Sequence, residues 1–244
     1  MPEVEGAGVA LHYVEQGTGR PLLVVHAMAS DAAAWDAVLD ELAAAGARAI
    51  AYDRRGYGSS GAPEPYVATT VQEQSEDAAA LLTALDAAPA VLVGEGFGAL
   101  VVLELLVRRP DLASAAVVAD PPLFAFVPSA TEALAEERAL LEQALRDVGP
   151  QGAIDAWLGE DARAPRRERT RVSRRGFFAD YAGQASWSPS RRELRSIAVP
   201  VAIVTSESSP AHVVAAADAA ASLLKDVRRR ADGDVVAAAR EVLG

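Results

Sequence analysis

The stretch Ala90-Val91-Leu92-Val93-Gly94-Glu95-Gly96-Phe97-Gly98-Ala99-Leu100-Val101-Val102-Leu103 decides the fold. It begins with a short apolar run that stops at Gly94, as expected of a strand buried inside a sheet. Apolar residues then continue almost without interruption to Arg108-Arg109-Pro110, where the proline ends the segment. The pattern predicts a strand, a tight turn built from three glycines, and an apolar helix.

The composition indicates one large α/β domain and excludes several kinds of site. The chain has 244 residues, enough for a substantial core, and no cysteine, so it forms no disulfide, thiolate metal site or cysteine nucleophile. The net charge of −11 argues against nucleic acid and anionic membranes as partners. No apolar run reaches the length of a membrane span, and the first residues lack the features of a signal peptide. We therefore expect a cytoplasmic protein.

Strands are predicted on both sides of the opening stretch. Residues 9–15 alternate in polarity and are followed by Gly17 and Gly19, which is typical of a strand in a hairpin. Residues 22–26 are continuously apolar, as in a strand of a parallel sheet that is covered on both faces. Further strands are expected at residues 47–52, 115–120, 199–205 and, at a charged sheet edge, 227–230.

Several helix starts are also visible. Ser30 or Asp31 can cap a helix that continues to residue 45. The spacing of Thr70–Glu73 and Ser129–Glu132 predicts two capping boxes. Ser209-Pro210 predicts a further start, with the serine as cap and the proline in the first helical position.

Three motifs follow one another in a specific order. A buried strand ends at His26 and leads into a loop, Asp53-Arg54-Arg55-Gly56-Tyr57-Gly58-Ser59-Ser60 has the form Asp-x-Arg-Gly-x-Gly-x-Ser, and residues 94–98 form a glycine-framed turn. In this order and spacing they resemble the α/β-hydrolase family, in which such a turn is the G-x-S-x-G nucleophile elbow. The resemblance implies an α/β fold with a mostly parallel, doubly wound sheet and helices on both faces.

The resemblance also implies a division of the chain. Residues 1–122 and 197–244 would form the α/β-hydrolase core, and residues 123–196 a helical lid, or cap, inserted into it. Aromatic residues concentrate in the insert, where they either line a pocket or serve the packing of the lid itself. Helices are expected there at residues 129–147, 153–158 and 172–181.

All three positions of the family's catalytic triad depart from the family pattern. The nucleophile position falls on Gly96, the acid position on Ser209 and the histidine position on Asp234. Glycine relaxes a turn that is strained when it carries a side chain, and Ser209 and Asp234 suit the caps of the helices that follow them. We therefore favour vacant catalytic positions over a rearranged catalytic set.

The family's binding apparatus is expected to persist. The amide of Phe97 and an amide of the Ala27–Met28 turn match the oxyanion hole, a site for an anion or a carbonyl oxygen. His26 would brace this loop, although Ala27 stands where the family has glycine. The expected ligand is a small, mostly apolar carbonyl or carboxylate compound. The predicted ligand-binding residues are Ala27, Met28, Gly96, Phe97, Asp120, Phe124 and Trp157.

Other functions remain open besides this pseudo-hydrolase. Glu95, Asp120 and Glu207 are candidate acid–base groups for a non-triad enzyme, such as a lyase, a cofactor-independent oxygenase or a divergent hydrolase. Ser30 or Ser59 could replace the missing serine, but no histidine is suitably placed to activate either one. A structural role, including a homodimer, is also compatible with the sequence. No spacing indicates a cofactor or a metal site.

Overall fold

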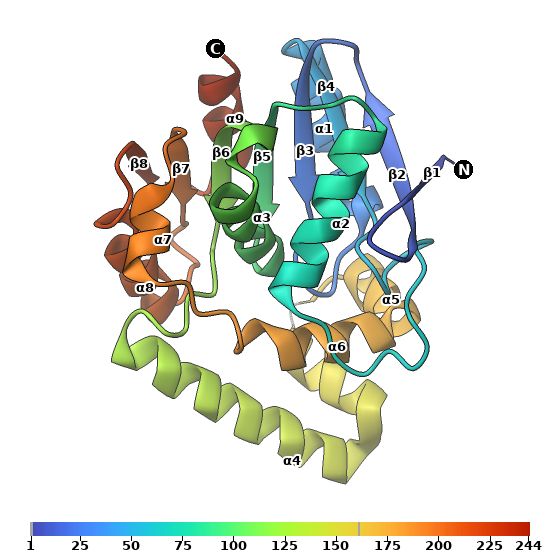
Figure 1. Ribbon diagram of the computed structural model, residues 1–244. Helices are drawn as coiled ribbons and strands as arrows, with labels where there is room; N and C mark the ends of the chain where they lie inside the picture. The colour runs from blue at the N-terminus through green and yellow to red at the C-terminus, as the bar shows by residue number, and fades with distance from the viewer. Residues whose placement is uncertain (1, 161) are drawn as a thin grey trace.

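The computed structural model describes residues 2–160 and 162–244 and has the predicted α/β-hydrolase fold, with an eight-stranded sheet and helices on both faces (Figure 1). Along the sheet the strand order is β1-β2-β4-β3-β5-β6-β7-β8. The pairs β1–β2 and β2–β4 are antiparallel, and the remaining pairs are parallel. The strands are β1 (Glu3–Glu5), β2 (Ala10–Gln16), β3 (Arg20–Val25), β4 (Ala47–Tyr52), β5 (Ala90–Glu95), β6 (Ala113–Ala119), β7 (Val201–Val204) and β8 (Val227–Arg230).

Strand β2 forms a hairpin with β1, but it does not pair with β3, the strand that follows it in the chain. Strand β4 pairs with β2 on one side and with β3 on the other, so it lies between them. The Gly17–Gly19 segment therefore passes over the end of β4 to reach β3, instead of making a hairpin turn between β2 and β3. A Cβ on Gly19 would lie 1.7 Å from the carbonyl oxygen of Gly46, which explains the need for glycine at this crossing.

The helices form two layers that pack against two separate apolar clusters. Helices α2, α3 and α8 contribute to one cluster, and α1 and α9 to the other. The expected capping box Thr70–Glu73 starts α2, and Asp31 caps the short helix η1. No helix of the described residues is both long and apolar enough to cross a bilayer. The helices of the core are η1 (Ala32–Trp35), α1 (Asp36–Ala44), α2 (Val71–Ala84), α3 (Phe97–Arg108), η2 (Pro110–Leu112), α8 (Ala211–Ala221) and α9 (Val235–Leu243).

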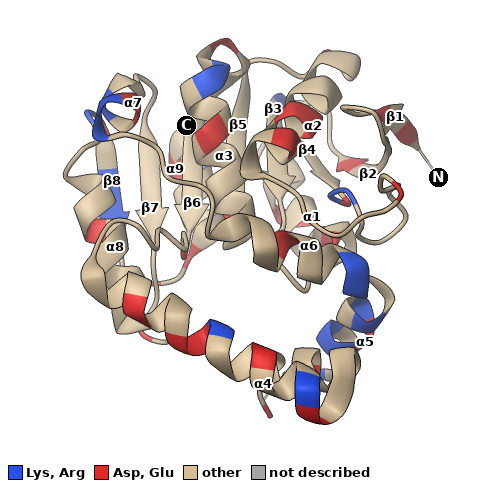
Figure 2. Cartoon of the chain, turned by 60° about the horizontal axis from the view of Figure 1, so that its bottom comes forward, with Lys and Arg blue, Asp and Glu red and all other residues tan. Residues whose placement is uncertain are grey.

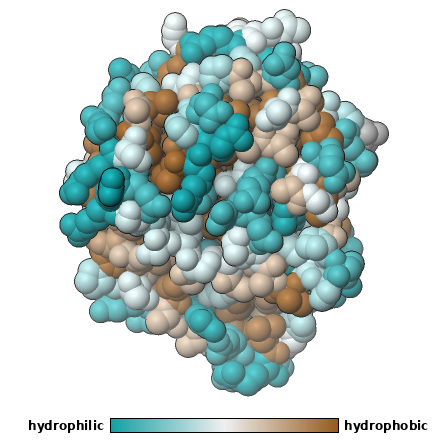
Figure 3. All heavy atoms as spheres, in the orientation of Figure 1, coloured by the Kyte–Doolittle hydropathy of each residue, from teal (hydrophilic) through white to brown (hydrophobic). Residues whose placement is uncertain are grey.

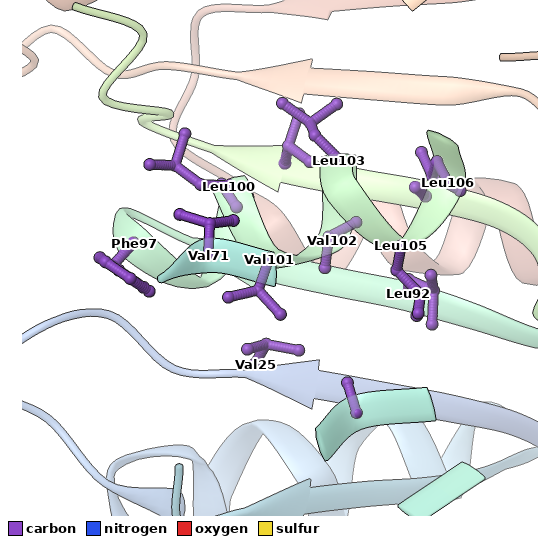
Figure 4. Packing of buried hydrophobic residues seen from close by; sticks show 14 of the residues in the cluster. Val25, Val71, Leu92, Phe97, Leu100, Val101, Val102, Leu103, Leu105 and Leu106 are labelled. Atoms are coloured by element: carbon purple, nitrogen blue, oxygen red, sulfur yellow. The ribbon is translucent and has the colours of Figure 1, made fainter. Parts of the chain in front are cut away.

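Helix α3 is buried along nearly its whole length at the centre of the molecule. Figure 4 shows its apolar side chains together with Val25 of β3 and Leu92 of β5, which belong to the same cluster. The glycines of the opening stretch allow this close approach: a Cβ on Gly98 would lie 2.0 Å from the carbonyl oxygen of Val25, and one on Gly94 would lie 2.4 Å from that of Gly98. The strand, turn and helix thus form one closely packed unit.

Residues 123–196 connect β6 to β7 and are largely helical. Predicted helices 129–147 and 153–158 correspond to the two arms of α4 (Pro128–Leu158), which are separated by a kink at Gly149, where the backbone is not helical (φ 73°). The Ser129–Glu132 capping box is wrong, because Val127 is the N-cap and no side chain caps the helix. Predicted helix 172–181 is instead divided between two helices that meet at Ser173. The remaining insert helices are α5 (Ala164–Val172), α6 (Arg174–Gln184) and α7 (Arg191–Ser196).

Candidate functional site at the strand–helix elbow

Gly96 links β5 to α3 in a backbone conformation that disfavours side chains. Its φ is 53° and its ψ is −120°, and it is the N-cap of α3. A Cβ built at this position would lie 3.2 Å from the Cβ of Ala27, which is tighter than an ordinary van der Waals contact. The sharp elbow is therefore retained, and the space into which a side chain at residue 96 would project is narrowed by Ala27.

His26 braces the neighbouring loop and uses both ring nitrogens to do so. The backbone amide of Arg54 donates to Nε2 at 3.0 Å, so the ring proton sits on Nδ1, which donates to the carbonyl oxygen of Ala27 at 2.7 Å. Burial, and next the charge of Arg54, lower the pKa of His26 well below its usual value. This imidazole is neutral and fully engaged, so it cannot serve as the general base of the elbow.

Arg54 lies behind this loop in a fully buried polar network that the sequence did not reveal. Its guanidinium donates to the carbonyl oxygens of His26 at 2.9 Å and Ala27 at 3.2 Å, and to Oδ2 of Asp180 at 2.6 Å. Burial alone would lower the pKa of Arg54, but the net shift is upward because Asp180 lies against it. Asp180 belongs to α6, so the insert is joined to the loop beside Gly96. The signal in the sequence that could have indicated this network is Asp180 itself, an acidic residue within an aromatic-rich helical segment.

The predicted oxyanion residues lie on both sides of the elbow. Phe97 is the first residue of α3, so its amide has no carbonyl partner within the helix. Its ring is buried and packs under the guanidinium of Arg54, 4.8 Å from the ring centroid. Met28 is also buried, whereas Ala27 is partly exposed. Any contact of Phe97 with a ligand would therefore come from the backbone and not from the ring.

Ser209, in the acid position, binds the side chain at the end of the adjacent strand. Its hydroxyl donates to Oδ1 of Asp120 at 2.5 Å and accepts from the amide of Ser206 at 2.7 Å. The expected role of Ser209 as a helix cap is wrong, because Pro210 is the N-cap of α8 and makes no side-chain cap bond. The hydroxyl oxygen, which a capping serine would use to accept from a helix amide, instead accepts from the amide of Ser206.

The remaining acidic positions near the sheet edge are solvent-accessible. Asp234, in the histidine position, caps α9 as expected, since its carboxylate accepts from the amide of Ala237 at 2.8 Å. Glu207 is exposed in the loop after β7.

Two of the candidate acid–base groups lie close enough to influence each other. Burial raises the pKa of Glu95, the charge of Arg166 opposes this rise, and the charge of Asp120 adds to it. Asp120 itself has a φ of 43°, a conformation that L-residues rarely adopt. The structure thus brings Glu95 and Asp120 near each other at the ends of β5 and β6.

The two predicted aromatic ligand contacts lie in the insert. Trp157 donates from Nε1 to Oε1 of Glu137 at 3.0 Å and packs edge-to-face on Phe177 with a 5.0 Å centroid separation. Arg166 lies over its ring at 6.0 Å. Phe124 is partly buried against the main cluster. These contacts of Trp157 are made with other residues of the insert.

In the described residues, no imidazole ring is hydrogen-bonded to the substitute serines, Ser30 and Ser59. In residues 2–160 and 162–244, none of the imidazole rings hydrogen-bonds a serine hydroxyl: His12 binds Asp53 at 3.0 Å, His26 is engaged as described, and His212 lies on α8. Within the same residues, no three histidine, aspartate or glutamate side chains gather as metal ligands. Neither Ser30 nor Ser59 is therefore activated by an imidazole.

Comparisons with known proteins agree with this architecture. An epoxide hydrolase of Caballeronia sordidicola is 39% identical over 104 residues, which are 43% of this chain and 32% of that protein. A bifunctional epoxide hydrolase 2 of Sus scrofa is 30% identical over 122 residues, 50% of this chain and 21% of that protein. The matched segments thus span a third or less of the length of these two relatives.

Solved structures match the whole chain in fold. An α/β hydrolase of Sphaerobacter thermophilus superposes with a TM-score of 0.81 at 20% identity, covering 100% of both chains. A thermophilic esterase of Thermogutta terrifontis gives 0.80 at 22% identity, covering 100% of this chain and 98% of that one. The model of the alpha/beta hydrolase family matches residues 22–242. The chain therefore belongs to the α/β-hydrolase family.

Proposed function

We propose that this family member binds a small, mostly apolar carbonyl or carboxylate compound at the elbow and does not cleave it through a serine nucleophile. The observation that carries the proposal is the elbow itself: Gly96 supplies no attacking atom, and Ala27 stands 3.2 Å from where a side chain would begin. The missing side chain at Gly96 and the crowding by Ala27 thus both disfavour a nucleophile at the elbow.

The other two catalytic positions support the same proposal. Ser209 is bound to Asp120, and Asp234 caps α9, so each has a local structural role. The imidazole of the loop beside Gly96, His26, has a lowered pKa and two hydrogen-bond partners. Without a base and a nucleophile, acyl transfer of the triad type has no route.

A binding role is supported by the groups that remain. The amides of Phe97 and of the Ala27–Met28 turn are suited to a negatively polarised oxygen, which the helix dipole of α3 also favours. Positive φ values at Ala29 (55°) and Asp120 (43°) retain backbone strain on both sides of the elbow. In this proposal residues 123–196 act as the lid, joined to the loops of the site by Asp180 and by Arg169, which pairs with Asp31 at 2.9 Å.

Activity toward activated esters tests the catalytic half of this proposal. We expect no hydrolysis of p-nitrophenyl acetate or butyrate above background, and no gain in the single variant G96S, because the histidine position holds Asp234. The triple variant A27G/G96S/D234H is the positive control. It removes the methyl group beside residue 96 and places a hydroxyl at the nucleophile position and an imidazole at the histidine position. Turnover by the wild type that is lost in D234A would contradict the proposal.

Amide chemical shifts test the binding half. Titration of the ¹⁵N-labelled protein with hexanoate should move the amide resonances of Ala27, Met28 and Phe97 and leave that of Ala237 in place. The Ala237 amide is a suitable control because it is already bound by Asp234. Shifts confined to residues away from the elbow would count against a site at Gly96.

A second candidate function rests on Glu95 and Asp120. Burial raises the pKa of Glu95, and such a carboxylate is a stronger base once it is ionised. This favours proton abstraction next to a carbonyl group, as in a lyase. The test is deuterium exchange at the α-carbon of cyclohexanone in D₂O, which should increase with pH as Glu95 ionises. If E95Q exchanges as fast as the wild type, this candidate fails.

A further inference from the structure

Helix α5 concentrates positive charge in a chain whose net charge is −11. Four of its nine residues are arginines, and Figure 2 shows positively charged positions gathered there, whereas acidic positions recur along α4. Apolar character is not gathered in this way on the face seen in Figure 3, where hydrophobic residues lie in patches among hydrophilic ones. Three of the four arginines form ion pairs, which are Arg167–Asp155 at 3.3 Å, Arg169–Asp31 at 2.9 Å and Arg171–Glu168 at 2.7 Å. The fourth, Arg166, is exposed and takes part in none of the ion pairs of the described residues, so its charge is available to a ligand.

Arg166 lies on the side of α5 that contacts the loop beside Gly96. Arg169 of α5 pairs with Asp31, which directly follows the loop of residues 27–30 in the chain. Because Arg166 precedes Arg169 by three positions, both side chains leave the same face of the helix. This face of α5 therefore lies next to the loop whose first two residues supply one half of the predicted oxyanion site.

Two further observations bring the charge of Arg166 close to the elbow itself. Its guanidinium lies over the ring of Trp157, 6.0 Å from the centroid, so the side chain is turned toward the second arm of α4. Burial raises the pKa of Glu95, and the charge of Arg166 opposes this rise, which places the guanidinium within electrostatic reach of that carboxyl group. Glu95 directly precedes Gly96. The guanidinium is thus near both an aromatic side chain of the insert and the end of β5.

The two acidic groups at the ends of β5 and β6 do not exclude an anion. Oδ1 of Asp120 accepts from the hydroxyl of Ser209 at 2.5 Å. Burial favours the protonated form of Glu95, in which the carboxyl group can donate a hydrogen bond to an anion. A carboxylate can form a charge-assisted, bidentate contact with Arg166, whereas a neutral carbonyl oxygen forms a weaker one. The groups around the elbow therefore favour a carboxylate.

We propose that Arg166 is the residue that selects a carboxylate over a neutral carbonyl compound at the elbow. The guanidinium binds the carboxylate from the side of the insert, and the amides of Phe97 and of the Ala27–Met28 turn bind it from the side of the core. The other arginines of α5 add to the local positive potential, which attracts anions to this part of a negatively charged molecule. The inference rests on the proposed function, because it assigns the class of ligand to the same site.

Titration of the ¹⁵N-labelled full chain with hexanoate and with hexanamide tests the inference. The two ligands share a chain length and differ in the charge of the head group. From the amide shifts of Ala27, Met28 and Phe97 we expect hexanoate to bind at least about tenfold more tightly than hexanamide, because its contact with Arg166 is charge-assisted. Equal affinities would overturn the inference and leave the proposed function in place. If neither ligand moves these resonances, the proposed function fails and the inference fails with it.

Variants of α5 assign the preference to one side chain. R166Q should weaken hexanoate about tenfold and leave hexanamide unchanged, whereas R166K keeps the charge and should retain most of the preference. R171Q is the matched control: it removes one arginine charge from the same helix, but this arginine pairs with Glu168, so both affinities should stay within about twofold of the wild type. Unchanged hexanoate affinity in R166Q, or an equal loss in R171Q, would overturn the role of Arg166.

Discussion

At the scale of single residues, the candidate site is defined by two small residues, Gly96 and Ala27, that lie next to each other. Gly96 holds a φ of 53°, and Ala27 occupies the space beside it. A glycine at such an elbow carries no strain, whereas any other residue does. Gly96 therefore adopts this conformation without the cost that a side chain would bring.

The variant G96S should be less stable than the wild type by about 1–3 kcal/mol, the usual cost of a side chain in this region of φ and ψ. Urea unfolding measures the difference. The double variant A27G/G96S lacks the 3.2 Å contact between residues 27 and 96. Once the effect of A27G alone has been subtracted, its loss in the free energy of unfolding should therefore be smaller than that of G96S. A midpoint for G96S equal to that of the wild type would show that this conformation does not strain a side chain.

Glu95 should make stability depend on pH. Because its pKa is raised in the folded protein, the folded state holds the proton more tightly than the unfolded state. Stability is therefore lost as pH rises from the unfolded pKa, about 4.3, through the raised folded value. We expect E95Q to melt at a higher temperature than the wild type at pH 7 and to lose this advantage near pH 4. E207Q, which removes an exposed carboxylate from the loop after β7, is the control.

At the scale of elements, strand β5 and helix α3 are positioned by glycines that permit contact between backbones. Gly98 is the critical one, since α3 approaches the end of β3 at this residue. Leu92 of β5 and the buried side chains of α3 then fill the same cluster (Figure 4). The close packing explains why the opening stretch contains so few polar residues.

The variant G98A tests this packing. Its Cβ would lie 2.0 Å from the carbonyl oxygen of Val25, and backbone cannot move aside as a flexible side chain can. We expect a loss of more than about 2 kcal/mol in the free energy of unfolding, as for overpacked cores. The control is G61A, whose Cβ would meet its nearest atom at an ordinary 3.5 Å. Equal stability of G98A and G61A would contradict this account of the contact.

At the scale of the whole molecule, the insert is fastened to the core by a buried ion pair and not only by apolar packing. Asp180 of α6 binds Arg54 at 2.6 Å, the hydroxyl of Tyr57 at 2.7 Å and Nε2 of Gln74 at 2.6 Å. Arg54 in turn holds the carbonyl groups of the loop next to the elbow. The orientation of the insert and the shape of that loop are therefore coupled.

Removing one member of the Arg54–Asp180 ion pair should strongly destabilise the folded protein. D180A leaves the charge of Arg54 buried without its partner, so we expect a loss of about 3–5 kcal/mol in urea unfolding and faster proteolysis within the insert. D155A removes a more exposed ion pair, with Arg167 at 3.3 Å, and should cost at most about 1 kcal/mol. A D180A variant as stable as D155A would show that the insert does not depend on Asp180.

The sequence by itself determined the strand–elbow–helix unit, the α/β class and the capping of α2 and α9, because apolar periodicity, glycine spacing and capping residues act between neighbours in the chain. It also identified Gly96 as a position without a nucleophile. Only the tertiary structure decided that Ser209 binds Asp120 instead of capping α8, that β4 separates β2 from β3, and that Asp180 reaches Arg54 across 126 positions. These outcomes depend on which distant groups share a buried space, where an unpaired polar atom is costly, and no local pattern records that competition.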